Sequence, residues 1–488
     1  MKFKVPSRGS RRHSRGHANA QSIEHLFNGP YPEAIVPPRA KGSPIAVGSH
    51  LEETPRNLMH IAIITAGGAG MFCGSCMHDN TWARALQDAG AEISLIPTYT
   101  PIRVDEPNLS TRHVFLGGVN VYLDYRWRFW NKLPRMLTHW LDTPWVINLA
   151  TRFGVSNDTR ELGELTLAML AGETGPQQTE VAELATFLGE LRPGVVVFSN
   201  ALLCGALREV KRHFDGPVFC TLQGDDVFLE GLAEEYRTEA VARISERAQQ
   251  FDGFLTHSRY YQNFMAEYLG LPAEKFHQLP LGIDLSDHDG LVKDESDCRP
   301  TIGYFARICP EKGLHNLIDA FRLLRKRCPD VRIRAGGYLG KQDEAYFARL
   351  RRDASDLGEA FEYIGSPPDH HAKVVFLKSI DVLSVPTDYR EPKGIYVLEA
   401  LANGVPVVQP DHGAFPELIA ATEGGLLYPA GDNAALAGAL QELLQQPRRR
   451  LELARAGQLR VRERFNPQVM AERSLEIFRD QTAAVTDG

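Results

Sequence analysis

Two successive series of alternating strand and helix patterns constrain this chain more than any other feature of its sequence. Short apolar runs such as MHIAIIT at 59–65 and VVVFS at 195–199 indicate buried parallel strands, and helical segments lie between such runs. A second series begins with TIGYFA at 301–306. This alternation predicts an α/β fold with two doubly wound, Rossmann-like domains. Ligands bind beyond the carboxyl ends of such strands, so we expect the two domains to face a cleft that holds the site.

Composition indicates where these domains begin and end. The chain has 488 residues, of which 43% are hydrophobic and 24% charged, which suits two globular domains. Residues 1–56 are rich in Arg, Ser, Gly and Pro, so we expect a disordered basic tail there. We expect Rossmann-like domains over 57–290 and 299–460, and a helix over 461–488 that crosses back to the first domain. An aromatic, helical insertion is expected at about 122–175.

Charge and apolar patterning restrict the class of protein. A net charge of −7 argues against a nucleic-acid binder, and the absence of an apolar run of about 18 residues argues against a membrane span. The basic start has no apolar stretch, so no secretory signal is expected. Apolar neighbours of Cys204 and Cys220 favour reduced thiols. We therefore expect a cytoplasmic protein. Trp and Arg in the insertion leave open a peripheral contact with the inner face of the membrane, and an extra helical layer is the alternative.

The segment DYREPKGIYVLEALANGVP, residues 388–406, carries the most informative chemistry. It predicts a loop with Glu391, then Gly394, then a helix over about 395–403 that contains Glu399. A helix N-terminus reached through a glycine presents free backbone N–H groups and a positive dipole end, which suit a phosphate. Glu399 would accept two hydrogen bonds from a ribose diol, and Glu391 would reach sugar hydroxyls or support positive charge at an anomeric carbon. A solvated helix residue and an ordinary loop carboxylate are the alternatives.

The loop after the first strand of each series adds further candidate ligand-binding residues. GYFARICPEKG places Arg307 and Lys312 on one glycine-closed loop, where they form a plausible clamp for a diphosphate or else a solvent-facing basic loop. AGGAG at 66–70 contains Gly67 and Gly68, which would let the backbone approach a ligand closely or serve packing alone.

The order of these elements resembles the E-x(7)-E signature of retaining glycosyltransferases of family 4, with Glu391 and Glu399 as its two acids. DVLSVPT before the segment and PDHGAFPE after it match as well. GYFARICPEKG resembles the family's GR-x(n)-EKG element, with Ala306 in place of its glycine. The resemblance extends roughly from residue 57 to the C-terminus. It implies the GT-B fold, with an acceptor-side domain over 57–290 and a nucleotide-sugar-binding domain over 299–460. It also implies transfer with retention of anomeric configuration. It implies no cofactor and no catalytic metal.

The resemblance also assigns roles to residues. Glu391 would lie by the donor sugar, while Arg307 and Lys312 would stabilise the departing diphosphate, and these three are the predicted catalytic residues. The predicted donor-binding residues are Glu399 at the ribose, with Gly394, Ile395, Gly67 and Gly68.

CTLQGDDVFLEGL differs from the family at one position. Gln223 stands where family members often carry a histidine near the sugar, and Asp225 and Asp226 follow it. We treat these three as candidate sugar or acceptor contacts, although acids after a strand are also ordinary helix N-caps.

The predicted partners are a nucleotide-sugar donor and a saccharide, lipid-linked or small-molecule acceptor, with no nucleic acid. A GT-B phosphorylase, a sucrose-synthase-like enzyme and a nucleotide-sugar epimerase are alternatives of similar fold. From another class, Cys73 and Cys76 form a C-x-x-C after a strand, which would suit a redox or metal-binding protein.

Overall fold

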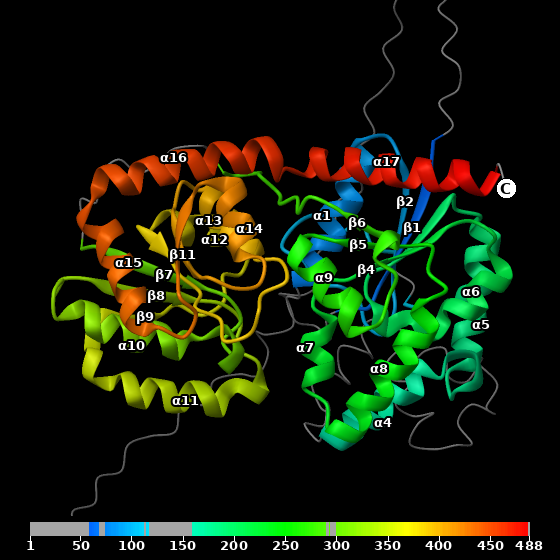
Figure 1. Cartoon of the computed structure of the whole chain (residues 1–488), viewed down its shortest axis with the longest axis horizontal. Helices are drawn as coiled ribbons and strands as arrows, with labels where there is room; N and C mark the ends of the chain where they lie inside the picture. The colour runs from blue at the N-terminus through cyan, green and yellow to red at the C-terminus, as the bar shows by residue number, and fades with distance from the viewer. Residues whose placement is uncertain are drawn as a thin grey trace, which may run out of the picture. The chain divides into compact units, whose positions relative to one another are not determined.

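The described residues form two parallel six-stranded sheets with helices packed on them (Figure 1). The computed structural model describes residues 58–67, 74–111, 114–116, 159–288, 292 and 299–486. The expected tail over 1–56 and most of the expected insertion, 122–158, lie outside the described residues. The two parallel sheets confirm the predicted doubly wound α/β fold.

The first sheet has the strand order β2-β1-β3-β4-β5-β6, and every neighbouring pair is parallel. Its strands are β1 His60–Thr65, β2 Glu92–Pro97, β3 Val195–Phe198, β4 Val218–Thr221, β5 Gly253–Thr256 and β6 Phe276–Gln278. The strand order reverses direction at β1, which has β2 on one side and β3 on the other. The loop after β1 therefore lies at a topological switch point, where ligands of such sheets bind.

The second sheet has the order β12-β11-β10-β7-β8-β9 and is also parallel throughout. Its strands are β7 Thr301–Phe305, β8 Arg332–Gly336, β9 Phe361–Tyr363, β10 Val382–Leu383, β11 Val407–Pro410 and β12 Gly425–Tyr428. Counted within this half, the order is that of a dinucleotide-binding sheet, with its switch point between β7 and β10. The loop of Arg307 and Lys312 follows β7, and the loop of Glu391 follows β10.

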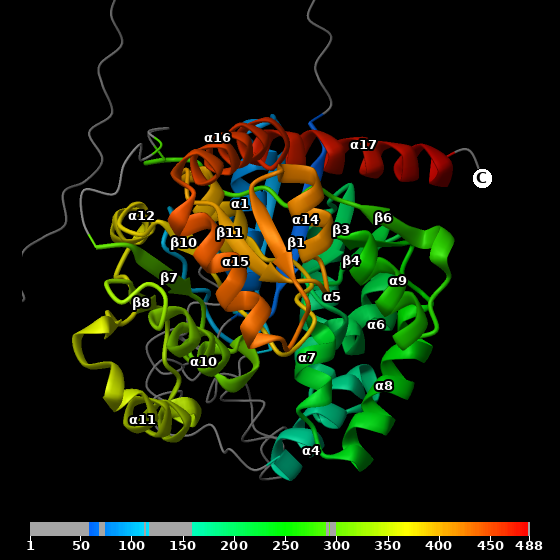
Figure 2. The ribbon, with the colours of Figure 1, turned by 60° about the vertical axis from the view of Figure 1, so that its left-hand side comes forward.

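Helices cover both sheets. Those of the first half are α1 Gly74–Asp88, α4 Thr159–Leu170, α5 Gln178–Leu191, α6 Leu207–His213, α7 Asp225–Glu230, α8 Glu234–Ala248 and α9 Arg259–Tyr268. Those that follow are α10 Leu314–Arg325, α11 Glu344–Asp353, α12 His370–Lys378, α13 Ile395–Ala402, α14 Phe415–Thr422, α15 Asn433–Gln445, α16 Pro447–Arg464 and α17 Pro467–Thr486. Figure 2 shows α10 and α15, which pack on each other, side by side.

Alternate residues of the first sheet face two separate cores. Ile64 and Phe198 belong to a core under the helices of the first half, whereas Ile63 and Phe219 face a second core that includes α1. Because a parallel strand is buried on both faces, its sequence reads as a continuous apolar run. This is why the strands of this half could be predicted from the sequence.

The last helix, α17, belongs to the core of the first half. Phe478 of α17 packs against Trp82 of α1 and Phe219 of β4, with ring centroids 6.2 Å and 5.1 Å apart. The indole N–H of Trp82 donates a hydrogen bond of 2.8 Å to the hydroxyl of Ser474. Figure 1 shows α17 following directly on α16 and crossing over α1, on which it packs. The last described helix therefore packs on the first half of the chain.

The segment between β3 and β4 is not one continuous helix. A 3₁₀ turn occupies Ala201–Ala206, and α6 begins only at Leu207. The guanidinium of Arg247 donates to the carbonyl oxygen of Gly205 at 3.2 Å and to that of Ala171 at 3.0 Å. A buried cation from another helix thus binds a carbonyl of this turn, a contact that local sequence does not reveal.

Candidate active site

The loop between β10 and α13 holds the first candidate carboxylate. Gly394 adopts a φ of +74° at the N-cap of α13, a left-handed conformation that glycine adopts without strain. Ile395 then begins the helix, as the sequence predicted. Glu391 precedes this turn and is buried, with 4% of its surface exposed. A buried carboxylate must be paired, so its partners define the chemistry of this loop.

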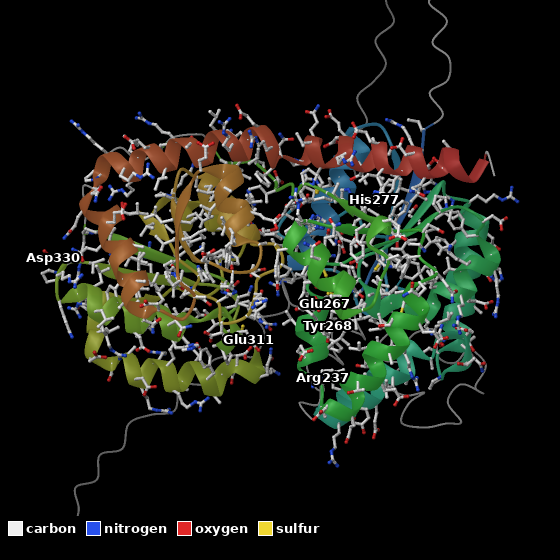
Figure 3. All side chains as sticks on the ribbon, in the orientation of Figure 1. Arg237, Glu267, Tyr268, His277, Glu311 and Asp330 are labelled. Atoms are coloured by element: carbon white, nitrogen blue, oxygen red, sulfur yellow. The ribbon has the colours of Figure 1, made fainter. Side chains whose placement is uncertain are left out.

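Glu391 and Lys312 form a buried ion pair. The Lys312 ammonium donates to Oε2 of Glu391 at 2.7 Å, and the hydroxyls of Tyr389 and Tyr396 donate to the same oxygen at 2.8 Å and 3.0 Å. Burial by itself raises the pKa of Glu391, but the charge of Lys312 and these hydrogen bonds lower that pKa to about 2. Glu391 is therefore a permanent anion at neutral pH. Lys312 sits one residue after the exposed Glu311, which Figure 3 labels.

Glu399 forms a second buried ion pair on the same helix. Lys373 of α12 lies 2.8 Å from Oε1 of Glu399 and 2.7 Å from Oδ2 of Asp105, which follows β2. Burial lowers the pKa of Lys373, but the two carboxylates outweigh that effect and raise it. Lys373 is thus a permanent cation shared by acids from both halves of the chain. Its pairing rules out the alternative in which Glu399 is a solvated helix residue.

A cavity of about 180 Å³ lies beside this second pair. Asp105, Lys373 and Glu399 line it together with Arg307 and Ile395. The first turn of α13 thus borders the cavity, and its free N–H groups favour an anion there. The remaining lining residues are Gly74, Met77, Phe305, Ala306, Gly337, Tyr338, Ser366, Pro367, Asp369 and Tyr396.

Arg307 and Lys312 have different environments. Arg307 is exposed, lines the cavity, and donates from Nε to the thiol sulfur of Cys309 at 3.3 Å. Lys312 is half-buried and paired with Glu391. The structure therefore brings Lys312 together with Glu391, and Arg307 together with Glu399, instead of placing all four side chains in one cluster.

Gln223 occupies a separate polar network at the carboxyl edge of the first sheet. Its amide nitrogen donates to Asp79 Oδ1 at 3.1 Å and to the Ser199 carbonyl at 2.8 Å, while its Oε1 accepts from Lys393 at 2.8 Å. Asp79 in turn accepts a hydrogen bond of 2.7 Å from the hydroxyl of Thr65.

The two acids after Gln223 bind protein groups. Asp225 is buried and accepts from the backbone N–H groups of Ala201, at 2.6 Å, and Gln223, at 2.9 Å. Asp226 accepts from the hydroxyl of Tyr261 at 2.6 Å. Neither lines the cavity beside Glu399.

The glycine loop after β1 is described in part. Gly67 has a φ of +79° and packs so closely on Thr100 that a Cβ there would lie 2.1 Å from the Thr100 carbonyl oxygen. This contact joins the loops after β1 and β2 at the switch point. Gly68 lies outside the described residues.

The cysteine pair of the redox or metal alternative is also described in part. Cys76 is buried on α1, and Cys73 lies outside the described residues. In the parts of the chain that are described, no group of three or more His, Cys, Asp or Glu side chains is arranged to hold a metal ion. None of the described helices is long and apolar enough to cross a bilayer.

Sequence reasoning did not name Lys373, Asp105 or Lys393. Asp105 and Lys373 lie in no motif, and only the fold brings them together. Lys393 does carry a signal, because it is a lysine between Glu391 and Gly394 in the most informative segment of the chain.

Solved structures share this architecture. Sucrose-phosphate synthase from Thermosynechococcus elongatus superposes with a TM-score of 0.63 at 19% identity, over 87% of this chain and all of that chain. Together with the two parallel sheets, this likeness shows that the protein has the GT-B fold.

Sequence comparison identifies the family. The family described as glycosyl transferases group 1 matches residues 292–460. A phosphatidyl-myo-inositol mannosyltransferase of Mycolicibacterium smegmatis is 31% identical over 283 residues, which are 55% of this chain and 67% of that protein. A GDP-mannose-dependent alpha-(1-6)-phosphatidylinositol monomannoside mannosyltransferase of the same organism is 33% identical over 221 residues, which are 41% of this chain and 55% of that protein. The chain belongs to the group 1 glycosyl transferase family. Across these and other relatives, the matched region covers from 43% to 69% of the relative's own length.

Proposed function

We propose that this protein is a retaining glycosyltransferase that moves a hexosyl group from a nucleotide-sugar donor onto a saccharide, lipid-linked or small-molecule acceptor. The observation that carries the proposal is the pairing of Lys312 with Glu391 on the loops after β7 and β10, beside a cavity that Arg307 and Glu399 line. Family membership and the GT-B fold support it. No described feature favours the phosphorylase, epimerase or cysteine-based alternatives over it.

The donor would lie across the second sheet at its switch point. Its diphosphate would bind near the first turn of α13 and Arg307, where N–H groups and a guanidinium offset negative charge. Its ribose would donate hydrogen bonds to Glu399. Such donors stabilise the charge that grows on the leaving group without help from a metal, and we propose that none is needed.

Glu391 would remain ionised next to the sugar because its pKa is about 2. A fixed anion of this kind supports positive charge that develops at the anomeric carbon. Lys312 would hold that anion in place and extend the positive field toward the diphosphate. The C1–O bond to the diphosphate breaks, the acceptor oxygen bonds to C1 on the same face, and the acceptor proton passes to the leaving phosphate.

Nucleotide binding tests the proposal directly. We expect calorimetry to show micromolar binding of one among UDP, GDP and ADP, at equal affinity with magnesium and with chelator. Lys312→Ala and Glu399→Gln should each weaken that binding at least about tenfold, which corresponds to 1.4 kcal/mol. Lys326→Ala is the matched control, because Lys326 is an exposed lysine at the end of α10. A folded wild-type protein that binds none of the three nucleotides would refute the proposal.

A further inference from the structure

Lys393 is a buried lysine to which the proposed function gives no role. It lies between Glu391 and Gly394 with 7% of its surface exposed. Its side chain leaves the loop after β10 and reaches the first half of the chain. There its ammonium donates to Oε1 of Gln223 at 2.8 Å and lies 3.4 Å from the hydroxyl oxygen of Ser75. Burying an ammonium costs free energy, and hydrogen bonds such as these offset part of that cost.

The side chain of Gln223 connects Lys393 to the first sheet, and its amide group has a fixed orientation. Its carbonyl oxygen must face the ammonium, because its amide nitrogen donates to Asp79 and to the Ser199 carbonyl. Asp79 is fully buried and also accepts from Thr65 at the end of β1. The network therefore links α1, β1, β3 and β4 to the Glu391 loop.

The backbone next to Lys393 makes a second contact with the same sheet. The hydroxyl of Ser258, which caps α9, donates to the carbonyl oxygen of Pro392 at 3.2 Å. Thus Pro392 and Lys393, the two residues after Glu391, both bind residues that follow strands of the first sheet. These contacts join the Glu391 loop to that sheet.

We propose that Lys393 is a positioning residue of the transfer reaction, which holds the Glu391 loop in register with the carboxyl edge of the first sheet through Gln223 and Asp79. The inference rests on the proposed function, in which the donor lies across the second sheet; the acceptor would then approach from the side of the first sheet. Reacting groups must lie within a few tenths of an ångström of their productive arrangement, and a displacement of about 1 Å can cost about a hundredfold in rate. Lys393 acts through its neighbours and not on the reacting atoms.

The charges around Asp79 give this role a measurable pH signature. Burial raises the pKa of Asp79 to about 6, even though the hydrogen bonds from Thr65 and Gln223 and the charge of Lys393 lower it. His78, whose Nδ1 lies 3.5 Å from Asp79, and His257, whose ring packs on His78, both have pKa values well below their usual range because they are buried. Asp79 therefore titrates near pH 6 next to Lys393. Burial also raises the pKa of Asp225, which accepts from the backbone N–H of Gln223, to about 6.

The direction of the expected shift follows from these charges. The Asp79 carboxylate accepts from both Gln223 and Thr65, whereas protonation turns one of its oxygens into a donor. The ordered network is therefore expected above pH 6 and is lost as the pH falls below it. Removing the Lys393 ammonium takes away a charge that favours the anion. The pKa of Asp79 should then rise, and the acid limb of the activity profile should move to higher pH.

Lys393→Met tests the inference, because methionine fills similar space without the charge. We would measure release of nucleoside diphosphate from UDP-glucose and GDP-mannose, with water in place of the acceptor, over pH 5–8 in the full-length protein. We expect nucleoside diphosphate affinity within about threefold of wild type, a release rate at least about tenfold lower, and an acid limb shifted upward. Lys326→Met is the control and should match wild type in all three respects.

Gln223→Met provides a second route if the lysine variant folds poorly, since it removes the partner and leaves the charge. Because Lys393 acts through Gln223, the double variant should lose no more activity than the worse single variant. This inference alone would be overturned if the two single variants had additive losses of activity. It would also be overturned if Lys393→Met released nucleoside diphosphate at the wild-type rate with the acid limb at the wild-type pH. If the wild-type protein releases no nucleoside diphosphate from either donor and binds no nucleotide, the proposed function falls and this inference falls with it.

Discussion

The ion pair between Lys312 and Glu391 makes a strong prediction about stability. The carboxylate is buried, and its pKa is lowered from 4.5 to about 2 even though burial opposes that change. A difference of this size corresponds to about 3 kcal/mol of stabilisation of the ionised form at 1.36 kcal/mol per pKa unit. Replacing Lys312 by methionine removes the main source of that stabilisation and leaves Tyr389 and Tyr396 as donors.

We expect Lys312→Met to lower the free energy of unfolding in urea by about 3 kcal/mol at pH 7, because removing one partner leaves a buried charge unpaired. The folded-state pKa of Glu391 is lowered, so the stability it contributes is fully present above pH 4.5 and is lost as the pH falls from 4.5 toward 2. The difference between wild type and variant should therefore narrow below pH 4.5.

Two further variants separate the ion pair from general damage. Lys326→Met removes an exposed lysine and should cost less than about 0.5 kcal/mol. Glu391→Gln combined with Lys312→Met removes both charges and should recover part of the loss. A cost below about 1 kcal/mol for Lys312→Met at pH 7, or the same cost at pH 7 and pH 4, would refute the reasoning.

Two other substitutions probe the packing that positions the site. Gly67→Ala should destabilise the protein by at least about 2 kcal/mol more than Gly90→Ala in thermal or urea unfolding. Both glycines have a positive φ, but only at Gly67 would a Cβ collide with Thr100. Equal losses of stability would show that Thr100 moves aside and that the close contact does not matter. Trp82→Phe should cost about 2 kcal/mol, because it removes the hydrogen bond to Ser474 and part of the packing on α17. Protease should then release α17 earlier, and unchanged release would contradict the role of this contact.

Much of the fold could be predicted from the sequence because the patterns that indicate strands and helices are local. A strand such as β1 is buried on both faces by the helices that cover its sheet, so four apolar residues in a row reveal it. The start of α13 was predicted from Gly394, because a glycine before an apolar helical run predicts a left-handed turn there. The order of strands and helices then restricts the topology to a doubly wound sheet.

The candidate site could be predicted only in part from the sequence. Glu391 and Lys312 were named from one signature each, and the contact between them follows from the adjacency of β7 and β10 in the second sheet. That Glu391 is buried and held by two tyrosines was not predicted, because Tyr389 and Tyr396 are ordinary aromatic residues in the sequence.

The sequence by itself thus determined the fold class, the order of the elements and the loops that carry the acids and cations, since each rests on residues a few positions apart. The tertiary structure alone decided which charges meet. Lys373 and Asp105 are 268 residues apart, and Lys393 and Gln223 are 170 residues apart, yet each pair is in hydrogen-bond contact. A side chain's charge is visible in the sequence, but its partner, burial and pKa depend on how distant segments pack, and no local pattern encodes that.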